Sequence, residues 1–211
     1  MLDADAELID ERIAVTGDLV ATVRELMTAA ATSELAPEEL EAIRGELAVL
    51  AARLAERSRP TPLRQHLDLA AIDRVRAGAS WPLWRHNPLA IPLDVRVHDG
   101  VASADLVPGP LYEGPPGSMH GGLSAAVLDS LLAVLAQVQR RRVVTVGLQV
   151  SYRAAIPLGA PVRLVGRIVG TEGRKTTAVG EILLPASGPG QPETVAVSAE
   201  ALLVEIPGAP D

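Results

Sequence analysis

Residues 112–135, YEGPPGSMHGGLSAAVLDSLLAVL, pass from a Pro- and Gly-rich loop into a long apolar segment. Between residues 121 and 139 the sequence has one formally charged residue, Asp129, among many Leu, Val and Ala. This composition predicts a helix that is hydrophobic nearly all round and buried inside a domain. An ionised carboxylate in an apolar core costs several kcal/mol unless it is paired or neutralised. We therefore expect Asp129 to point into a cavity where it takes part in chemistry.

The composition is that of a globular protein. The chain has 211 residues, 48% of them hydrophobic, which suits one domain with an appendage or two small domains. Without cysteine there is no disulfide, thiolate nucleophile or thiolate metal site, which fits a cytoplasmic protein. The acidic N-terminus, MLDADAELIDER, is unlike a secretory signal. Because Asp129, Pro or Gly interrupts the longest uncharged runs, we expect no transmembrane span.

The net charge of -7 is unevenly distributed. Residues 1–59 hold 13 acids and 6 bases, whereas residues 140–175 hold eight bases and one acid, Glu172. The bases are Arg140, Arg141, Arg142, Arg153, Arg163, Arg167, Arg174 and Lys175. Two interpretations are open: a solvated strand face, or a site for an anionic group. Aromatic residues are 2% of the chain, so stacking surfaces for nucleic acid are scarce and a phosphorylated small molecule fits better.

Residues 1–59 are predicted to form a helical hairpin. Apolar residues recur at helical spacing over residues 6–30, and Pro37 is placed as the first residue of a second helix. That second helix has an apolar stripe spaced by alternate steps of three and four: Leu40, Ile43, Leu47, Leu50 and Leu54. The stripe predicts a packing seam, either within the hairpin or against another subunit.

Residues 60–92 are predicted to be a joint made of a helix and a Pro-rich passage. Residues 63–77 have the pattern of a third helix, and WPLWRHNPLAIPL, residues 81–93, reads as extended chain. His66 and His86 lie here without metal-ligand spacing, so we interpret them as structural or exposed. We expect no metal site in this protein.

From residue 93 to residue 211 the apolar period changes to two, which predicts strands. They cover residues 93–97, 101–107, 143–152, 161–169, 175–184 and 193–206, the first two joined by a turn at Asp99-Gly100. In the 143–152 strand, Val144, Val146, Leu148, Val150 and Tyr152 are expected on one face, with Thr145, Gln149 and Ser151 on the other. We expect an α+β fold in which an antiparallel sheet wraps a single apolar helix.

The start of that helix is suited to binding a carbonyl oxygen. Gly117, Gly121 and Gly122 flank His120, so unpaired backbone N–H groups are exposed and a ligand can approach them closely. Such amides stabilise the oxyanion that develops when a carbonyl is attacked. Asp129 has the chemistry of a general base acting on water, or of a nucleophile.

The distance between these groups has a consequence for assembly. Gly121 and Asp129 are eight residues apart, or about 12 Å along one helix. Attack on a carbonyl needs both groups within roughly 3 Å of the reacting atoms. One helix cannot supply both to the same substrate. A two-fold dimer with antiparallel helices can, so catalysis implies a homodimer.

Several motifs together resemble a known family. HGG is followed nine residues after the histidine by an acid, then by TVxLxVxY and a GRK turn, with NPLAxPL and YEGPPG upstream. Over residues 87–206 the chain is similar to the hotdog-fold acyl-CoA thioesterases of the phenylacetate-pathway type, relatives of 4-hydroxybenzoyl-CoA thioesterase. The resemblance implies an antiparallel sheet around a central helix, and an active site that spans a dimer interface.

The resemblance also implies roles for individual residues. The Gly121 amide would polarise the thioester carbonyl, His120 would shape the helix start, Asp129 would activate water, and Thr145 matches a Thr or Ser position that assists in some members. The substrate-binding candidates are Gly122, Gly114, Arg153, Arg174 and Lys175; some relatives have Asn where this chain has Gly114. No cofactor is implied, because coenzyme A is part of the substrate.

The main hypothesis is therefore a cytoplasmic acyl-CoA thioester hydrolase that is a homodimer, or a tetramer, with no nucleic-acid or membrane partner. Two alternatives stay open. One is a hotdog protein that binds acyl-CoA or an acyl carrier without turnover. The other is a scaffold that acts through the N-terminal helices.

Overall fold

The computed structural model describes residues 2–63, 67–139, 142–188 and 190–206. The chain forms two compact units, one made of residues 1–65 and 86–89 and the other of residues 66–85 and 90–211. The chain thus leaves the second unit after Arg85, contributes four residues to the first, and returns at Ala90. The division after residues 59 and 92 stays a prediction.

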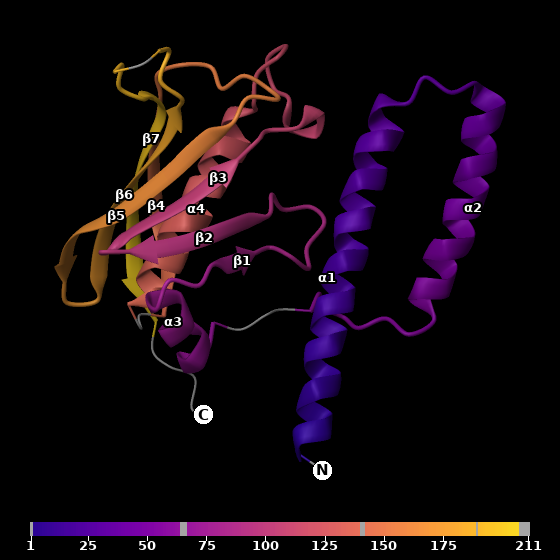
Figure 1. Cartoon of the computed structure of the whole chain (residues 1–211), viewed down its shortest axis with the longest axis horizontal. Coiled ribbons are helices and arrows are strands. Elements are labelled where there is room, and N and C mark those ends of the chain that lie inside the picture. The colour runs from indigo at the N-terminus through magenta and orange to yellow at the C-terminus, as the bar shows by residue number, and fades with distance from the viewer. Residues whose placement is uncertain (1, 64–66, 140–141, 189, 207–211) are drawn as a thin grey trace. The chain divides into compact units, whose positions relative to one another are not determined.

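The first unit is built on two antiparallel helices, α1 (Leu2–Thr32) and α2 (Pro37–Ala55), joined by a short loop (Figure 1). Residues 86–89 belong to this unit because they bond to α1: His86 Nε2 lies 2.8 Å from the Ile13 carbonyl oxygen, and Arg24 Nη2 donates to the Asn87 carbonyl oxygen at 2.7 Å. His86 is buried and has a structural contact. His66 lies outside the described residues.

Helix α2 forms as its sequence predicts, but its apolar stripe is not a seam inside the hairpin. Pro37 is at the helix start, and the Glu39 carboxylate accepts the Ala36 N–H at 3.3 Å. None of the α2 residues is buried. The hairpin therefore leaves the Leu40–Leu54 face largely exposed, with Leu50 54% and Leu54 57% accessible.

The second unit is a seven-stranded antiparallel sheet around one helix (Figure 1). Its elements are α3 (Leu69–Arg76), β1 (Trp81–Leu83), β2 (Leu93–His98), β3 (Val101–Leu106), the 3-10 turn η1 (Pro110–Tyr112), α4 (Gly121–Val138), β4 (Val143–Tyr152), β5 (Val162–Glu172), β6 (Lys175–Leu184) and β7 (Thr194–Glu205). The strand order is β1-β2-β3-β5-β6-β7-β4. The predicted α+β hotdog architecture is confirmed.

Local signals explain most of the element boundaries. The β2–β3 turn has positive φ at Asp99 (48°) and Gly100 (75°), as a two-residue hairpin of this twist requires. Helix α3 is shorter than the 63–77 segment expected, because the Asp68 side chain caps it by accepting the Ala71 N–H. Strand β1 lies in the passage predicted only as extended chain.

Helix α4 packs closely on the sheet through four fully buried leucines: Leu128, Leu131, Leu132 and Leu135. Facing them, Gly166 and Gly180 are directly paired across β5 and β6. A Cβ added at Gly166 would lie 2.8 Å from Leu132 Cδ2, and one at Gly180 would lie 3.3 Å from Leu128 and Leu132. The absence of two side chains therefore sets how near the helix lies to the strands.

The expectation that α4 is buried all round, with Asp129 in an apolar core, is wrong for this chain. One face carries residues that are not buried: Gly122, Ala126, Asp129, Ala133 and Gln137. Asp129 is partly exposed, so no desolvated carboxylate has to be explained. Among the described helices, α4 alone has the length and composition to cross a membrane; half of it is buried, as in the core helix of a folded domain.

The expected side-chain alternation in β4 is also wrong at one point. Thr145 pairs with Leu203 and Gly147 with Leu202, so a β-bulge falls between Thr145 and Gly147. The extra residue exchanges the faces of the sheet to which the side chains on either side of the bulge would otherwise point. Thr145 therefore faces α4, as Leu148 does, instead of pointing away from it.

We predict that Gly166→Val destabilises the second unit by about 1–3 kcal/mol, because the new side chain would overlap Leu132. The measurement is denaturant unfolding followed by tryptophan fluorescence. Gly170→Ala is the matched control, since it lies on the same strand with nothing within 4 Å of its Cβ position. Equal midpoints for the two variants would show that Gly166 does not set the helix-to-sheet spacing.

Candidate active site

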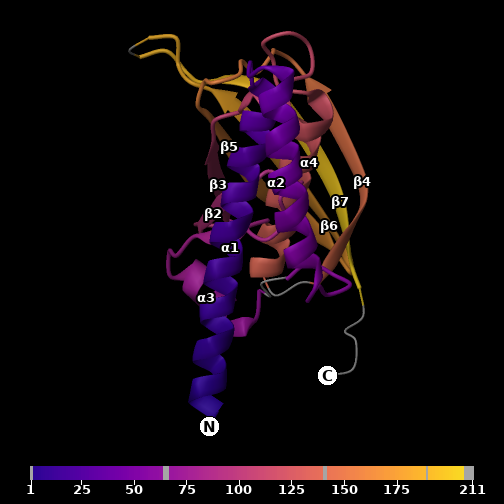
Figure 2. The ribbon, with the colours of Figure 1, turned by 90° about the vertical axis from the view of Figure 1, so that its right-hand side faces the viewer.

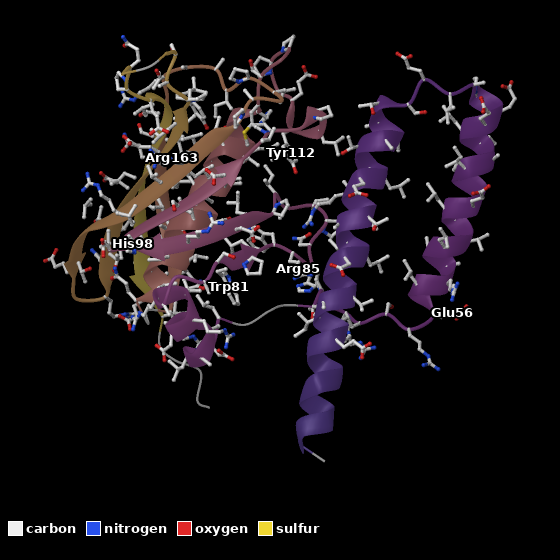
Figure 3. All side chains as sticks on the ribbon, in the orientation of Figure 1. Glu56, Trp81, Arg85, His98, Tyr112 and Arg163 are labelled. Carbon is white, nitrogen blue, oxygen red and sulfur yellow. The ribbon has the colours of Figure 1, made fainter. Side chains whose placement is uncertain are left out.

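The loop before α4 is held in one shape by backbone contacts to its own residues. The Tyr112 carbonyl oxygen accepts the His120 N–H at 2.7 Å, and the Ser118 carbonyl oxygen accepts the Gly114 N–H at 2.8 Å. Figure 3 shows Tyr112 in this loop. A Cβ at Gly114 would lie 2.7 Å from His120 Cα. The loop can lie this close to His120 only because Gly114 has no side chain.

His120 is the N-cap of α4, and its cap leaves one amide open. The His120 Nδ1 atom accepts the Gly122 N–H at 3.0 Å, and its carbonyl oxygen accepts the Leu123 and Ser124 N–H groups. Within the described part of the chain, the Gly121 N–H has no hydrogen-bond acceptor. The first helical amide is thus an available donor at the positive end of the helix dipole.

Tyr152, which the sequence analysis left without a role, fixes the Gly121 peptide. The Tyr152 hydroxyl donates to the Gly121 carbonyl oxygen at 3.0 Å. A Cβ at Gly121 would lie 3.0 Å from Tyr152 Cε1, so the ring packs against the glycine. The sequence pattern that could have identified Tyr152 is the alternation of β4, which places its side chain on the same face as Leu148 and Val150.

A cavity of about 410 Å³ opens beside Gly121. Its lining includes Ser124, Tyr152, Arg153, Ile156 and Val197. Its volume is in the range of small-molecule sites, and it combines apolar walls with one guanidinium and an open amide.

Asp129 and Thr145 are brought together by the β4 bulge. Thr145 Oγ1 donates to Asp129 Oδ1 at 2.7 Å. Among the described residues, nothing bonds to the second carboxylate oxygen, Oδ2. The contact holds the carboxylate in one orientation and leaves that oxygen available to accept a proton. Asp129 and Gly121 lie on one uninterrupted helix, about 12 Å apart at 1.5 Å per residue.

The predicted basic residues fall in two groups. Arg153 borders the Gly121 cavity, and its Nη2 lies 3.5 Å from Ser198 Oγ. Arg174 and Lys175 are at the tip of the β5–β6 hairpin, where Lys175 pairs with Val204, one register row from Thr145. The Arg174 guanidinium also donates twice to the Glu205 carbonyl oxygen, at 3.0 and 2.7 Å.

Of the other members of the basic segment, one is paired and two lie outside the described residues. Arg163 forms an ion pair with Glu193, which raises the pKa of Arg163 above its usual value. Arg140 and Arg141 lie outside the described residues. The described residues contain no group of three or more His, Asp or Glu side chains placed to hold a metal ion.

Known proteins resemble this chain both in sequence and in fold. Residues 116–185, which include α4, match the thioesterase superfamily. The crystal structure of a thioesterase superfamily protein superposes with a TM-score of 0.72 at 28% identity, covering 90% of this chain and 94% of that one. Over these residues the chain is similar to the thioesterase superfamily. The resemblance inferred from the HGG segment is confirmed at this level.

A second relative is the acyl-coenzyme A thioesterase THEM4 of Xenopus laevis, 43% identical over 68 residues. The match covers 32% of this chain and 31% of the relative, so it spans about a third of that protein's length. The superposition on the thioesterase superfamily crystal structure is longer and covers 90% of this chain. The part of this chain that it does not cover is shorter than α1 and α2 together, so the superposition includes at least part of the N-terminal helices.

We predict that His120→Ala destabilises the second unit by about 1 kcal/mol, because the Gly122 amide loses its cap. His120→Asn keeps a short side-chain acceptor and should lose less. Chemical unfolding of both variants tests this. If the two variants lose equal stability, the cap contact does not carry the effect of His120.

Proposed function

We propose that this protein is an acyl-CoA thioester hydrolase in which Asp129 acts on water and the Gly121 amide binds the oxyanion. The observation that carries the proposal is the open Gly121 N–H at the capped start of the helix that also carries the Thr145-bound Asp129. The likeness to an acyl-coenzyme A thioesterase over 68 residues, which favours acyl-CoA as the thioester, supports it.

Asp129 and the Gly121 N–H act together when water attacks the thioester. Asp129 takes a proton from water as the oxygen attacks the thioester carbonyl, and the negative charge moves to the carbonyl oxygen, where the Gly121 N–H stabilises it. The tetrahedral intermediate then collapses, the carbon–sulfur bond breaks, and the leaving thiolate takes the proton from Asp129. The products are a carboxylic acid and free coenzyme A. A carboxylate attack that forms an anhydride is the nucleophilic variant.

The proposal requires two chains, because about 12 Å separates the two groups along α4. In a homodimer with antiparallel α4 helices, Asp129 of one chain would meet Gly121 of the other. Strand β4 supports such a dimer, because it is the edge of the sheet next to β7 (Figure 2) and its Val144 and Val146 are 44% and 57% exposed. The small residues Gly122, Ala126 and Ala133 on the open face of α4 would allow close helix approach.

The basic groups suit the phosphates of coenzyme A. Arg174 and Lys175, on the β5–β6 turn near the Thr145 end of β4, are proposed to contact the phosphates. Arg153 is proposed to do so from beside Gly121. Gly122 and Gly114 would keep the approach to the helix start free of side chains.

We predict that Asp129→Asn lowers kcat for acyl-CoA hydrolysis by about 10²- to 10⁴-fold, because the base is lost. Thr145→Val keeps the carboxylate and loses one charged hydrogen bond, so a smaller loss of about 10- to 100-fold is expected. A thiol-release assay over short, long and aromatic acyl-CoAs measures both. If the wild-type protein binds acyl-CoA but releases negligible thiol, the result would support the non-catalytic alternative instead.

We predict that Gly121→Pro lowers kcat by about 10²- to 10³-fold, because proline removes the proposed oxyanion donor. Proline is tolerated at the first helical position, and His120 already has the extended conformation that precedes proline, with φ -63° and ψ 131°. Gly121→Ala is the control: it makes the same Cβ contact with Tyr152 but keeps the N–H. Equal losses in both variants would point to the Tyr152 contact and exclude the amide.

We predict that inactive Asp129→Asn and Gly121→Pro chains regain activity when they are refolded together. A mixed dimer has one site with both groups intact, so about a quarter of the wild-type sites are restored at equal mixing. The thiol-release assay after mixing measures the recovery. Sites formed within one chain would give no recovery, which would contradict the shared-site arrangement.

A further inference from the structure

Helix α2 presents an apolar face of which no residue is buried in the described part of the chain. The face is the stripe Leu40, Ile43, Leu47, Leu50 and Leu54, of which Leu50 is 54% and Leu54 57% exposed. Among the described residues, neither hydrophobic core of the protein includes a residue of α1 or α2. Contiguous exposed apolar residues at spacings of three and four mark a helix-to-helix contact surface.

The stripe is nearly symmetric about its centre. Leu40 and Leu54 each lie seven residues from Leu47, and Ile43 and Leu50 lie four and three residues from it. A surface that reads almost the same in both directions fits a two-fold contact, in which each chain presents the same patch. A contact with a different protein does not require this symmetry.

The charges beside the stripe also run in opposite order at its two ends. Glu39 and Glu46 lie on one flank of α2 in its first half, and Arg53 lies on the same flank in its last turn. Figure 3 labels Glu56, the C-cap residue, which directly follows the last turn that contains Arg53. When two copies of a helix pair antiparallel about a two-fold axis, the same flanks meet in reverse order. With the axis near Leu47, Glu39 of one copy then lies opposite the last turn of the other copy, near its Arg53, at both ends of the pair.

We propose that α2 binds α2 of a second copy of this chain, antiparallel, with the two-fold axis near Leu47. This contact is separate from the dimer proposed for catalysis and does not depend on the thioesterase activity. Where the axes of the two two-fold contacts meet at a right angle, the assembly is a closed tetramer.

The first test compares two substitutions of equal charge in the full-length chain. Leu50→Glu places a carboxylate in the stripe and is expected to halve the mass measured by light scattering after size exclusion. Ala52→Glu lies on the opposite face and is expected to leave the mass unchanged. Neither residue is buried, so helix content by circular dichroism should stay equal. An unchanged mass for Leu50→Glu overturns the proposal.

A second test uses the charges. The single variants Arg53→Glu and Glu39→Lys each place like charges opposite one another at both ends of the pair, so each alone should have the smaller mass. Mixing the two should restore the larger mass. If the mixture keeps the smaller mass, or if both variants alone keep the larger one, the charge pairing is overturned.

A third test reports the orientation and uses the absence of native cysteine. Leu47→Cys places one thiol near the axis in each copy, so a short bis-maleimide should link the two chains. Leu40→Cys places the thiols 14 residues apart along an antiparallel pair, or about 21 Å, and should not be linked. Linking of both variants indicates a parallel pair, and linking of neither indicates no α2 contact; either result overturns the proposal.

Thiol release by the Leu50→Glu variant is expected at wild-type level. This measurement separates the outcome for the α2 contact from the outcome for the catalytic proposal.

Discussion

The close contact between α4 and the paired glycines Gly166 and Gly180 is the constraint on which the rest of the second unit depends. Four leucines of α4 are fully buried there. Each buried leucine contributes about 1.5–3 kcal/mol. With the helix held at this depth, the side chains of β4 reach its polar groups: the Thr145 hydroxyl reaches Asp129, and the Tyr152 hydroxyl reaches the Gly121 carbonyl. A helix lying further from the sheet would lose both contacts.

Most of the fold was predictable from periodicity, because helix and strand periods are local properties of the sequence. The Asp99-Gly100 turn, the six strands after residue 93 and the long helix all follow from such signals. The bulge in β4 did not, because alternation assumes an unbroken ladder. Gly147, a glycine inside an apolar strand, was the available sign of a bulge. Without the bulge, Thr145 would have pointed away from Asp129, so the site pairing came from the structure.

The environment of Asp129 was mispredicted for a related reason. Hydropathy counts Gly and Ala as apolar, and these residues make the open face of α4 look like core. Small residues bury little surface, so the same pattern suits a face that is reserved for another chain. The N-terminal helices show this limit again. Local sequence predicted both helices and the α2 stripe, but whether α1 or another copy covers the stripe depends on contacts that no local pattern contains.

Strand β4 bonds to α4 at both ends, through Thr145 at one and Tyr152 at the other, and it is also the outermost strand of the sheet. These two residues support different half-sites if the active site is shared between chains. A one-residue slip of β4 against β7 would displace the base and the oxyanion donor together. The positions of the Asp129 carboxylate and the Gly121 peptide therefore both depend on the register of β4. A natural variant that shifts β4 should disturb both groups together.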